Sequence, residues 1–197
     1  MAILVAGCDT GDGKQLQPYD PTDYPAPTPA TPATSITPAT EMSNSTVESF
    51  TLTAPWASGE TIEDRHTCDG LDIAPALSWG GVPDGTVEIA ITMVDDSAVS
   101  DGQPFVHWAI TGLDPDEIAL IEGDVPEGAV QALNFFGDVD YGGPCPPPGD
   151  DAHLYRFTAY ALNTSLGLAD GTLATEFLGA IAQATIRSTD LNGTYQR

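Results

Sequence analysis

Positive charge is the scarcest feature of this sequence. Lysine and arginine together number 5, with Lys14 the only lysine, against 29 aspartates and glutamates, and the formal net charge is −24. A surface of this charge repels phosphate backbones, so nucleic-acid binding is excluded. Binding to an anionic membrane through basic patches is excluded for the same reason. The acids are scattered along the chain, which is typical of a solvating surface.

Long apolar runs are also lacking, since no stretch approaches the roughly 20 residues of a transmembrane helix. The first eight residues, MAILVAGC, are apolar and end in small residues before Cys8. This pattern resembles a bacterial lipobox, although it lacks a basic start and its apolar segment is short for a signal peptide. We expect residues 1–8 to be the truncated end of a lipoprotein signal, with Cys8 as the lipidation site. The alternative is a chance match.

Residues 9–48 form an acidic segment rich in proline, threonine and alanine, as in YPAPTPATPATSITPAT. Such a composition has no apolar periodicity and buries too little surface to offset the entropy of ordering. Its prolines favour extended conformations, so we expect a disordered, semi-stiff tether. A tether after a lipidated cysteine suits an exported protein of the bacterial cell envelope that reaches the membrane only through its N-terminal lipid. The alternative is a disordered tail without an anchor.

From residue 49 to residue 197 the composition is that of a folded domain. Short runs rich in β-branched and aromatic residues are separated by Gly, Pro and Asp turn signals. The candidate strands are 49–54, 76–79, 87–94, 105–111, 129–134, 154–162 and 191–197. One helix is predicted over residues 172–186, with Thr172 as its N-cap. Many short strands and one late helix indicate a mainly β sandwich with minor helical decoration.

The chain contains three cysteines. If Cys8 carries lipid, Cys68 and Cys145 remain as an even pair in an exported protein, which predicts a disulfide between them. A zinc site formed by these two cysteines with His66 and His153 is the competing interpretation. The spacing of these four residues follows no standard Cys/His pattern, which favours the disulfide.

Two of the three histidines stand in strands that could border a site. His107 lies inside the apolar run FVHWAI, where a histidine is more often a core residue than a ligand, and His153 opens the strand HLYRF. Asp95 and Asp96 end the strand at 87–94 and precede an irregular stretch. Acids placed at a strand end beside a long connection often border a site, but each of these signals is weak by itself.

Taken together, these segments resemble a known family. TCDGLDIAPALSW comes first, followed by the strand that ends in aspartate, then HW, then NFFGDVDYGGPCPPPGDDAHLYRFTAYAL. In this order they look like the phosphatidylethanolamine-binding protein family, and within it the bacterial, Raf kinase inhibitor-like branch. The resemblance covers residues 49–197, and its YGGPCPPPG block is highly specific. It implies a β-sandwich of two packed sheets with a small anion-binding pocket at one end.

The resemblance also assigns the pocket residues. The matched motifs place His107, Pro147, His153 and Tyr155 at ligand-binding positions. The pocket acid is Asp95 if the match is anchored on Ala98, and Asp96 if a VDDPDAP form is matched; we favour Asp95. Leu154 stands where the family usually carries arginine, which removes a positive charge near the pocket. No cofactor, metal or catalytic residue is expected.

A pocket of this kind suits a small anionic or phosphorylated molecule, such as a lipid headgroup. The prolines of PCPPPG restrict the backbone to one shape, and two histidines and a tyrosine supply hydrogen-bond donors. Two alternatives remain open. The domain could inhibit a kinase or protease through protein contacts, or it could be a hydrolase that uses an Asp–His pair, although no G-x-S-x-G turn is present. Because dimers exist in the bacterial branch, the resemblance also allows a homodimer.

Overall fold

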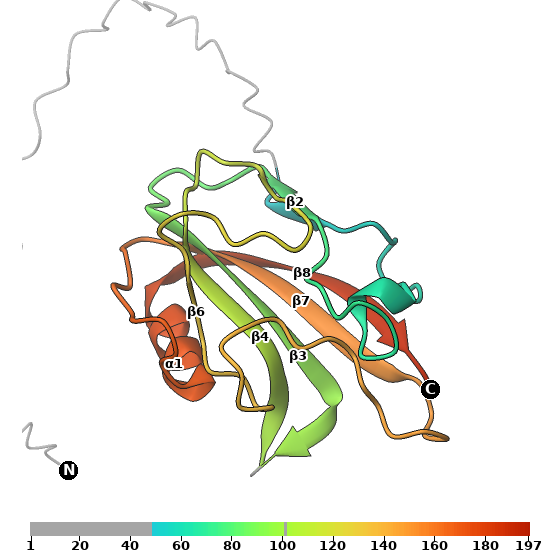
Figure 1. Cartoon of the computed structure of the whole chain (residues 1–197). Helices are drawn as coiled ribbons and strands as arrows, with labels where there is room; N and C mark the ends of the chain where they lie inside the picture. Colours follow the sequence, from blue (N-terminus) through green and yellow to red (C-terminus); the bar gives the residue numbers. More distant parts are fainter. Residues whose placement is uncertain (1–48, 101) are drawn as a thin grey trace, which may run out of the picture. The chain divides into compact units, whose positions relative to one another are not determined.

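The computed structural model describes residues 49–197 apart from Asp101. Three short strands, β1 (Thr51–Thr53), β2 (Leu77–Gly80) and β5 (Ala119–Leu120), form an antiparallel sheet in the order β1-β2-β5. The larger antiparallel sheet, in the order β6-β4-β3-β7-β8, contains β3 (Glu88–Ser100), β4 (Gln103–Leu113), β6 (Val130–Gln131), β7 (His153–Leu162) and β8 (Thr185–Tyr195). A short 3-10 helix, η1 (Asp64–His66), and one α-helix, α1 (Ala174–Ala184), complete these elements (Figure 1). The predictions for residues 1–8, Cys8 and 9–48 lie outside the described residues.

The two sheets share one apolar core. Leu52 and Trp79 from the smaller sheet belong to the same buried cluster as Phe157 from the larger one. On the large sheet's other side, α1 inserts Phe177 and Ile181 into two further clusters, both formed with residues of the large sheet (Figure 1). The predicted mainly β sandwich of two packed sheets with a helix near the C-terminus is therefore confirmed.

The helix is shorter than predicted at both ends. It begins at Ala174 with Leu173 as the N-cap, and no side chain caps it, so the prediction of Thr172 as the N-cap is wrong. The Thr172 carbonyl instead accepts a hydrogen bond from Leu133 N–H (2.8 Å), which keeps Thr172 in the preceding connection. At the other end, β8 begins at Thr185, which pairs with Leu162 of β7. Sheet pairing therefore ends the helix before the apolar pattern does.

Strand β3 continues beyond residue 94, where the sequence pattern predicted its end. Its pairing with β4 extends to Ser100 opposite Gln103, with register shifts after Met93 and again after Asp95. Asp95 and Asp96 therefore lie within a strand rather than at its end. Because adjacent residues of a strand point to opposite faces, the two carboxylates are directed to opposite sides of the sheet.

No helix within residues 49–100 and 102–197 is long and apolar enough to span a membrane.

Candidate functional site

A small cavity lies at one end of the large sheet. Asp95, towards the end of β3, pairs with Phe105 on β4 and with Tyr155, near the start of β7. The cavity at this end has a volume of about 130 Å³. Its lining comprises Asp95, Ala98, Phe105, His107, Phe136, Cys145, Pro146, Pro147, His153 and Tyr155. Of the six residues predicted to bind a ligand, all but Asp96 line it.

Asp95 and His153 form a hydrogen-bonded pair across β3 and β7. Asp95 is 3% exposed, and its Oδ2 lies 2.7 Å from Nδ1 of His153. Its Oδ1 accepts a hydrogen bond from the backbone N–H of Ser97 (2.8 Å), so both carboxylate oxygens are engaged. Because an ionised carboxylate only accepts, Nδ1 of His153 carries the hydrogen of this pair. Nε2 is therefore the nitrogen of His153 that remains for a ligand.

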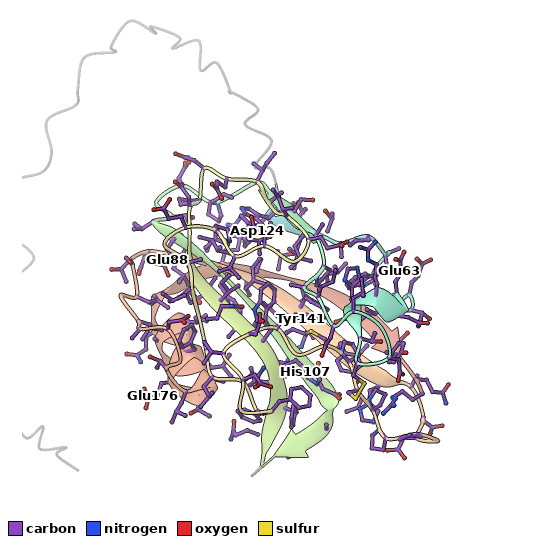
Figure 2. The ribbon with its side chains drawn as sticks, viewed as in Figure 1. Glu63, Glu88, His107, Asp124, Tyr141 and Glu176 are labelled. Atoms are coloured by element: carbon purple, nitrogen blue, oxygen red, sulfur yellow. A yellow bond between two sulfur atoms is a disulfide. The ribbon has the colours of Figure 1, made fainter. Side chains whose placement is uncertain are left out.

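His107 is oriented by the backbone of the loop that follows β6. Its Nδ1 lies 2.7 Å from the carbonyl oxygen of Gly142, which can only accept, so Nδ1 is again the donor. In return, Gly142 N–H donates to the His107 carbonyl (3.2 Å). Burial lowers the pKa of His107, although the nearby Gly142 carbonyl and the Asp95 carboxylate act in the opposite direction. The ring is therefore neutral at pH 7, and its Nε2 presents a lone pair. The His107 side chain is labelled in Figure 2.

The hydroxyl of Tyr155 has no hydrogen-bond partner among the described residues, although the side chain is fully buried. The ring contacts His107 edge to face, with ring centroids 5.2 Å apart. Burial, with smaller contributions from the nearby Asp95 carboxylate, raises the pKa of Tyr155 and outweighs the opposite effect of the Cys145 backbone, so the hydroxyl keeps its proton. A buried polar group without a partner costs free energy, and such a group beside a cavity is available to a ligand.

The remaining wall is the proline loop, residues 142–149, which is attached to the segment after η1. Cys145 and Cys68 form a disulfide with Cα atoms 5.4 Å apart, which confirms the predicted bond. Gly143 N–H donates to Oδ1 of Asp72 (2.7 Å). Both thiols needed by the zinc alternative are therefore consumed. Within the described residues, no group of three or more histidines, cysteines and acids is arranged to hold a metal ion.

Two phenylalanines in the lining were not predicted from the sequence. Phe105 and Phe136 lie 4.9 Å apart between ring centroids, and each lies 5.1 Å from the ring of His107. Phe105 stands two residues before His107 on β4, so the period of a strand could have placed it on the same face. Phe136 comes from the connection after β6 and is 48% exposed. No periodicity predicts its position.

Asp96 lies outside the cavity, so its prediction as a pocket acid is corrected. Arg156 donates to both of its oxygens at 2.8 Å. These hydrogen bonds lower the pKa of Asp96 below its usual value. Leu154 also faces away from the cavity, because it alternates with His153 and Tyr155 along β7. An arginine at position 154, which the family usually carries, would therefore not be part of the cavity lining.

Comparison with known proteins identifies relatives of this chain. The family model described as phosphatidylethanolamine-binding protein matches residues 53–196. A Mycobacterium tuberculosis protein named "Putative lipoprotein LppC" is 34% identical over 100% of this chain and 92% of its own length. A UPF0098 protein of Methanothermobacter thermautotrophicus is 39% identical over 69% of this chain and 91% of its own. The crystal structure of Escherichia coli YbcL, described as a member of the mammalian PEBP family, matches with a TM-score of 0.71 and 28% identity over 75% of this chain and 98% of that one.

The family match covers the whole large sheet, β2 and β5 of the smaller sheet, and every residue that lines the cavity. The matched range also includes the proline loop and the two histidines of the cavity, His107 and His153. This chain therefore belongs to the phosphatidylethanolamine-binding protein family.

Proposed function

We propose that the domain binds a small oxyanion, a phosphate ester or a carboxylate, in the cavity between β3, β4, β7 and the proline loop. The observation that carries this proposal is the buried hydroxyl of Tyr155, which lacks a partner and lines the cavity. Nε2 of His107 and Nε2 of His153 remain for a ligand beside it, because each ring uses its Nδ1 within the protein. Three polar atoms, carried by β4 and β7 on either side of β3, thus border one small space.

The volume of the cavity limits the size of the ligand. Liquid water occupies about 30 Å³ per molecule, so 130 Å³ corresponds to a few waters or to one phosphate or carboxylate group. Pockets that enclose a whole drug-sized molecule measure about 300–1,000 Å³. The cavity is therefore suited to a headgroup, and any larger part of the ligand would remain outside it.

Tyr155→Phe tests this proposal by removing the hydroxyl alone. We expect the variant to be as stable as the wild type or up to about 1 kcal/mol more stable, because a buried unpaired hydroxyl disappears. We also expect it to bind dimethyl phosphate roughly tenfold more weakly, because a hydrogen bond to a charged ligand is lost. Urea denaturation and NMR titration measure the two effects.

Tyr141→Phe is the matched control. The Tyr141 hydroxyl donates to the His66 carbonyl (2.8 Å) and does not line the cavity. Its removal should lower the free energy of unfolding by about 1 kcal/mol and change affinity less than twofold. Equal affinity of Tyr155→Phe and the wild type for dimethyl phosphate would contradict the proposed site.

The Asp95–His153 pair also fits the hydrolase alternative, since a carboxylate that orients an imidazole is the usual arrangement of a general base. The cavity lining described here contains no serine or threonine, and its cysteine is in the disulfide. A hydrolase at this site would therefore have to activate water directly. Binding is the function that the residues support better, and inhibition of a kinase or protease stays a prediction.

We further propose that lipid attached to Cys8 tethers this domain to the cell envelope. The support is the apolar segment before Cys8 and a relative named as a lipoprotein that aligns with the whole chain. In a bacterial host, the precursor should fractionate with membranes, and Cys8→Ala should move it to the soluble fraction with its affinity for dimethyl phosphate unchanged. A Cys8→Ala protein that stays with the membranes would refute the tether.

A further inference from the structure

The charges around the cavity restrict which oxyanions it can hold. We propose that the cavity selects an oxyanion with a single negative charge, such as a phosphodiester or a carboxylate, and takes up a proton when the ligand binds. This inference rests on the proposed function and adds the charge state of the ligand to it.

The proton is required by the hydrogen-bonding capacity of the lining. His107 and His153 each use their Nδ1 hydrogen within the protein, the first on the Gly142 carbonyl and the second on Asp95. With both rings neutral, each Nε2 offers only a lone pair, and Tyr155 is the remaining side-chain donor. The oxygens of a fully ionised oxyanion are all acceptors. Such a ligand can engage an imidazole only if a proton is added to one Nε2.

Two acidic side chains line a hollow that adjoins the cavity at His153. A hollow of about 550 Å³ shares His153 with the cavity and is also lined by Asp150 and Asp151. One Asp150 oxygen lies 3.9 Å from Nε2 of His153. Together with Asp95 inside, these carboxylates give the site a negative field, which opposes each further negative charge of a ligand.

No lysine or arginine among the described residues lines the cavity. Arg197 contacts the lining from outside, because its Nη1 lies 3.7 Å from the sulfur of Cys145. Its guanidinium is held by Asp69, with N–O distances of 2.9 to 3.1 Å. Arg156 is paired with Asp96 on the outer face of the sheet. Among the described residues, a dianion in the cavity would therefore meet no lysine or arginine in the lining, and both Arg197 and Arg156 are already paired with carboxylates.

Two probes of similar size separate the possible outcomes. Dimethyl phosphate carries one charge at every pH used, whereas methyl phosphate loses its second proton with a pKa of about 6. At pH 8 only about 1% of methyl phosphate is singly charged, so its apparent affinity should be at least tenfold weaker than that of dimethyl phosphate. At pH 5.5 the two affinities should agree within about threefold. Calorimetry in buffers of different ionisation enthalpy should show uptake of about one proton with dimethyl phosphate at pH 8.

Tighter binding of methyl phosphate at pH 8, or binding of dimethyl phosphate without proton uptake, would overturn the inference and leave the proposed function intact. If neither probe shifts the NMR signals of the full chain at either pH, the proposed function fails and this inference fails with it.

The double substitution Asp150→Asn/Asp151→Asn tests the carboxylates directly. Coulomb energy is proportional to the net charge that binding adds to the site. A monoanion that binds with one proton adds no net charge, whereas a dianion that binds with one proton adds one negative charge. At pH 8 and low ionic strength we expect the affinity for dimethyl phosphate to change less than twofold and that for methyl phosphate to increase about threefold, with this gain reduced by salt. The control Asp124→Asn/Glu127→Gln removes the same charge from exposed positions outside the cavity lining and should change either affinity less than twofold. An equal gain for methyl phosphate in both double variants would show that net charge, not the position of Asp150 and Asp151, determines selection.

Discussion

Replacing Cys68 and Cys145 together by serine is expected to lower the free energy of unfolding by about 4 kcal/mol. The bond joins positions 77 residues apart, so it closes a long loop in the unfolded chain and reduces the entropy of that state. In the native state it also joins the proline loop to the segment that carries Asp72, next to the cavity. We therefore expect weaker binding of dimethyl phosphate along with the loss of stability. Urea denaturation of the full chain measures the first effect, and NMR titration measures the second.

Each single serine variant serves as a control, because it breaks the bond and leaves one thiol. Cys68→Ser and Cys145→Ser should each lose about as much stability as the pair. Reductant should destabilise the wild type by a similar amount and leave the double variant unchanged. Urea midpoints that coincide for wild type and double variant, with and without reductant, would show that the disulfide contributes nothing to stability.

Gly143→Ala is expected to destabilise the protein by about 3 kcal/mol through overpacking. A Cβ atom at this position would lie 2.4 Å from the carbonyl oxygen of His66 and 2.5 Å from Oδ1 of Asp72. The first neighbour is backbone next to a fully buried side chain, and the second accepts the hydrogen bond from Gly143 itself. Neither can move without separating the proline loop from the segment after η1. Urea denaturation should show the loss.

Gly142→Ala provides the comparison at the adjacent residue. There the new Cβ would lie 2.7 Å from the Phe136 ring, which is 48% exposed and can turn into solvent. The loss of stability should therefore stay at or below about 1 kcal/mol. Because Phe136 lines the cavity, its displacement should still weaken the binding of dimethyl phosphate. Equal destabilisation by the two substitutions would contradict this account of the loop.

The sequence predicts the strands of the large sheet better than their ends. Runs such as VEIAITMV and LYRFTAYAL are dense in residues that favour strands, and both became β3 and β7. The extension of β3 through Asp95 could not be predicted, because it depends on register shifts in its pairing with β4. The early start of β8 at Thr185 depends in the same way on pairing with β7. These boundaries are tertiary, and no local propensity encodes them.

The cavity residues that belong to sequence motifs could be predicted. Those that reach the cavity through irregular connections could not. His107, His153 and Tyr155 came from the resemblance to a family, whereas the choice between Asp95 and Asp96 depends on the extension of β3 beyond residue 94. Two adjacent residues of one strand cannot both face the same cavity. Phe136, by contrast, reaches the cavity only through the course of an irregular connection.

The disulfide also determines what a protease could do to this domain. The connection between β5 and β6 is largely exposed, and it lies between the two cysteines in the sequence. A cut there would leave Asp95 and His107 on one fragment and His153 and Tyr155 on the other. The Cys68–Cys145 bond would keep the two fragments covalently joined, while the pairing of β3 with β7 would keep them in register. A nicked molecule would thus retain every polar group of its cavity, although no single fragment carries them all.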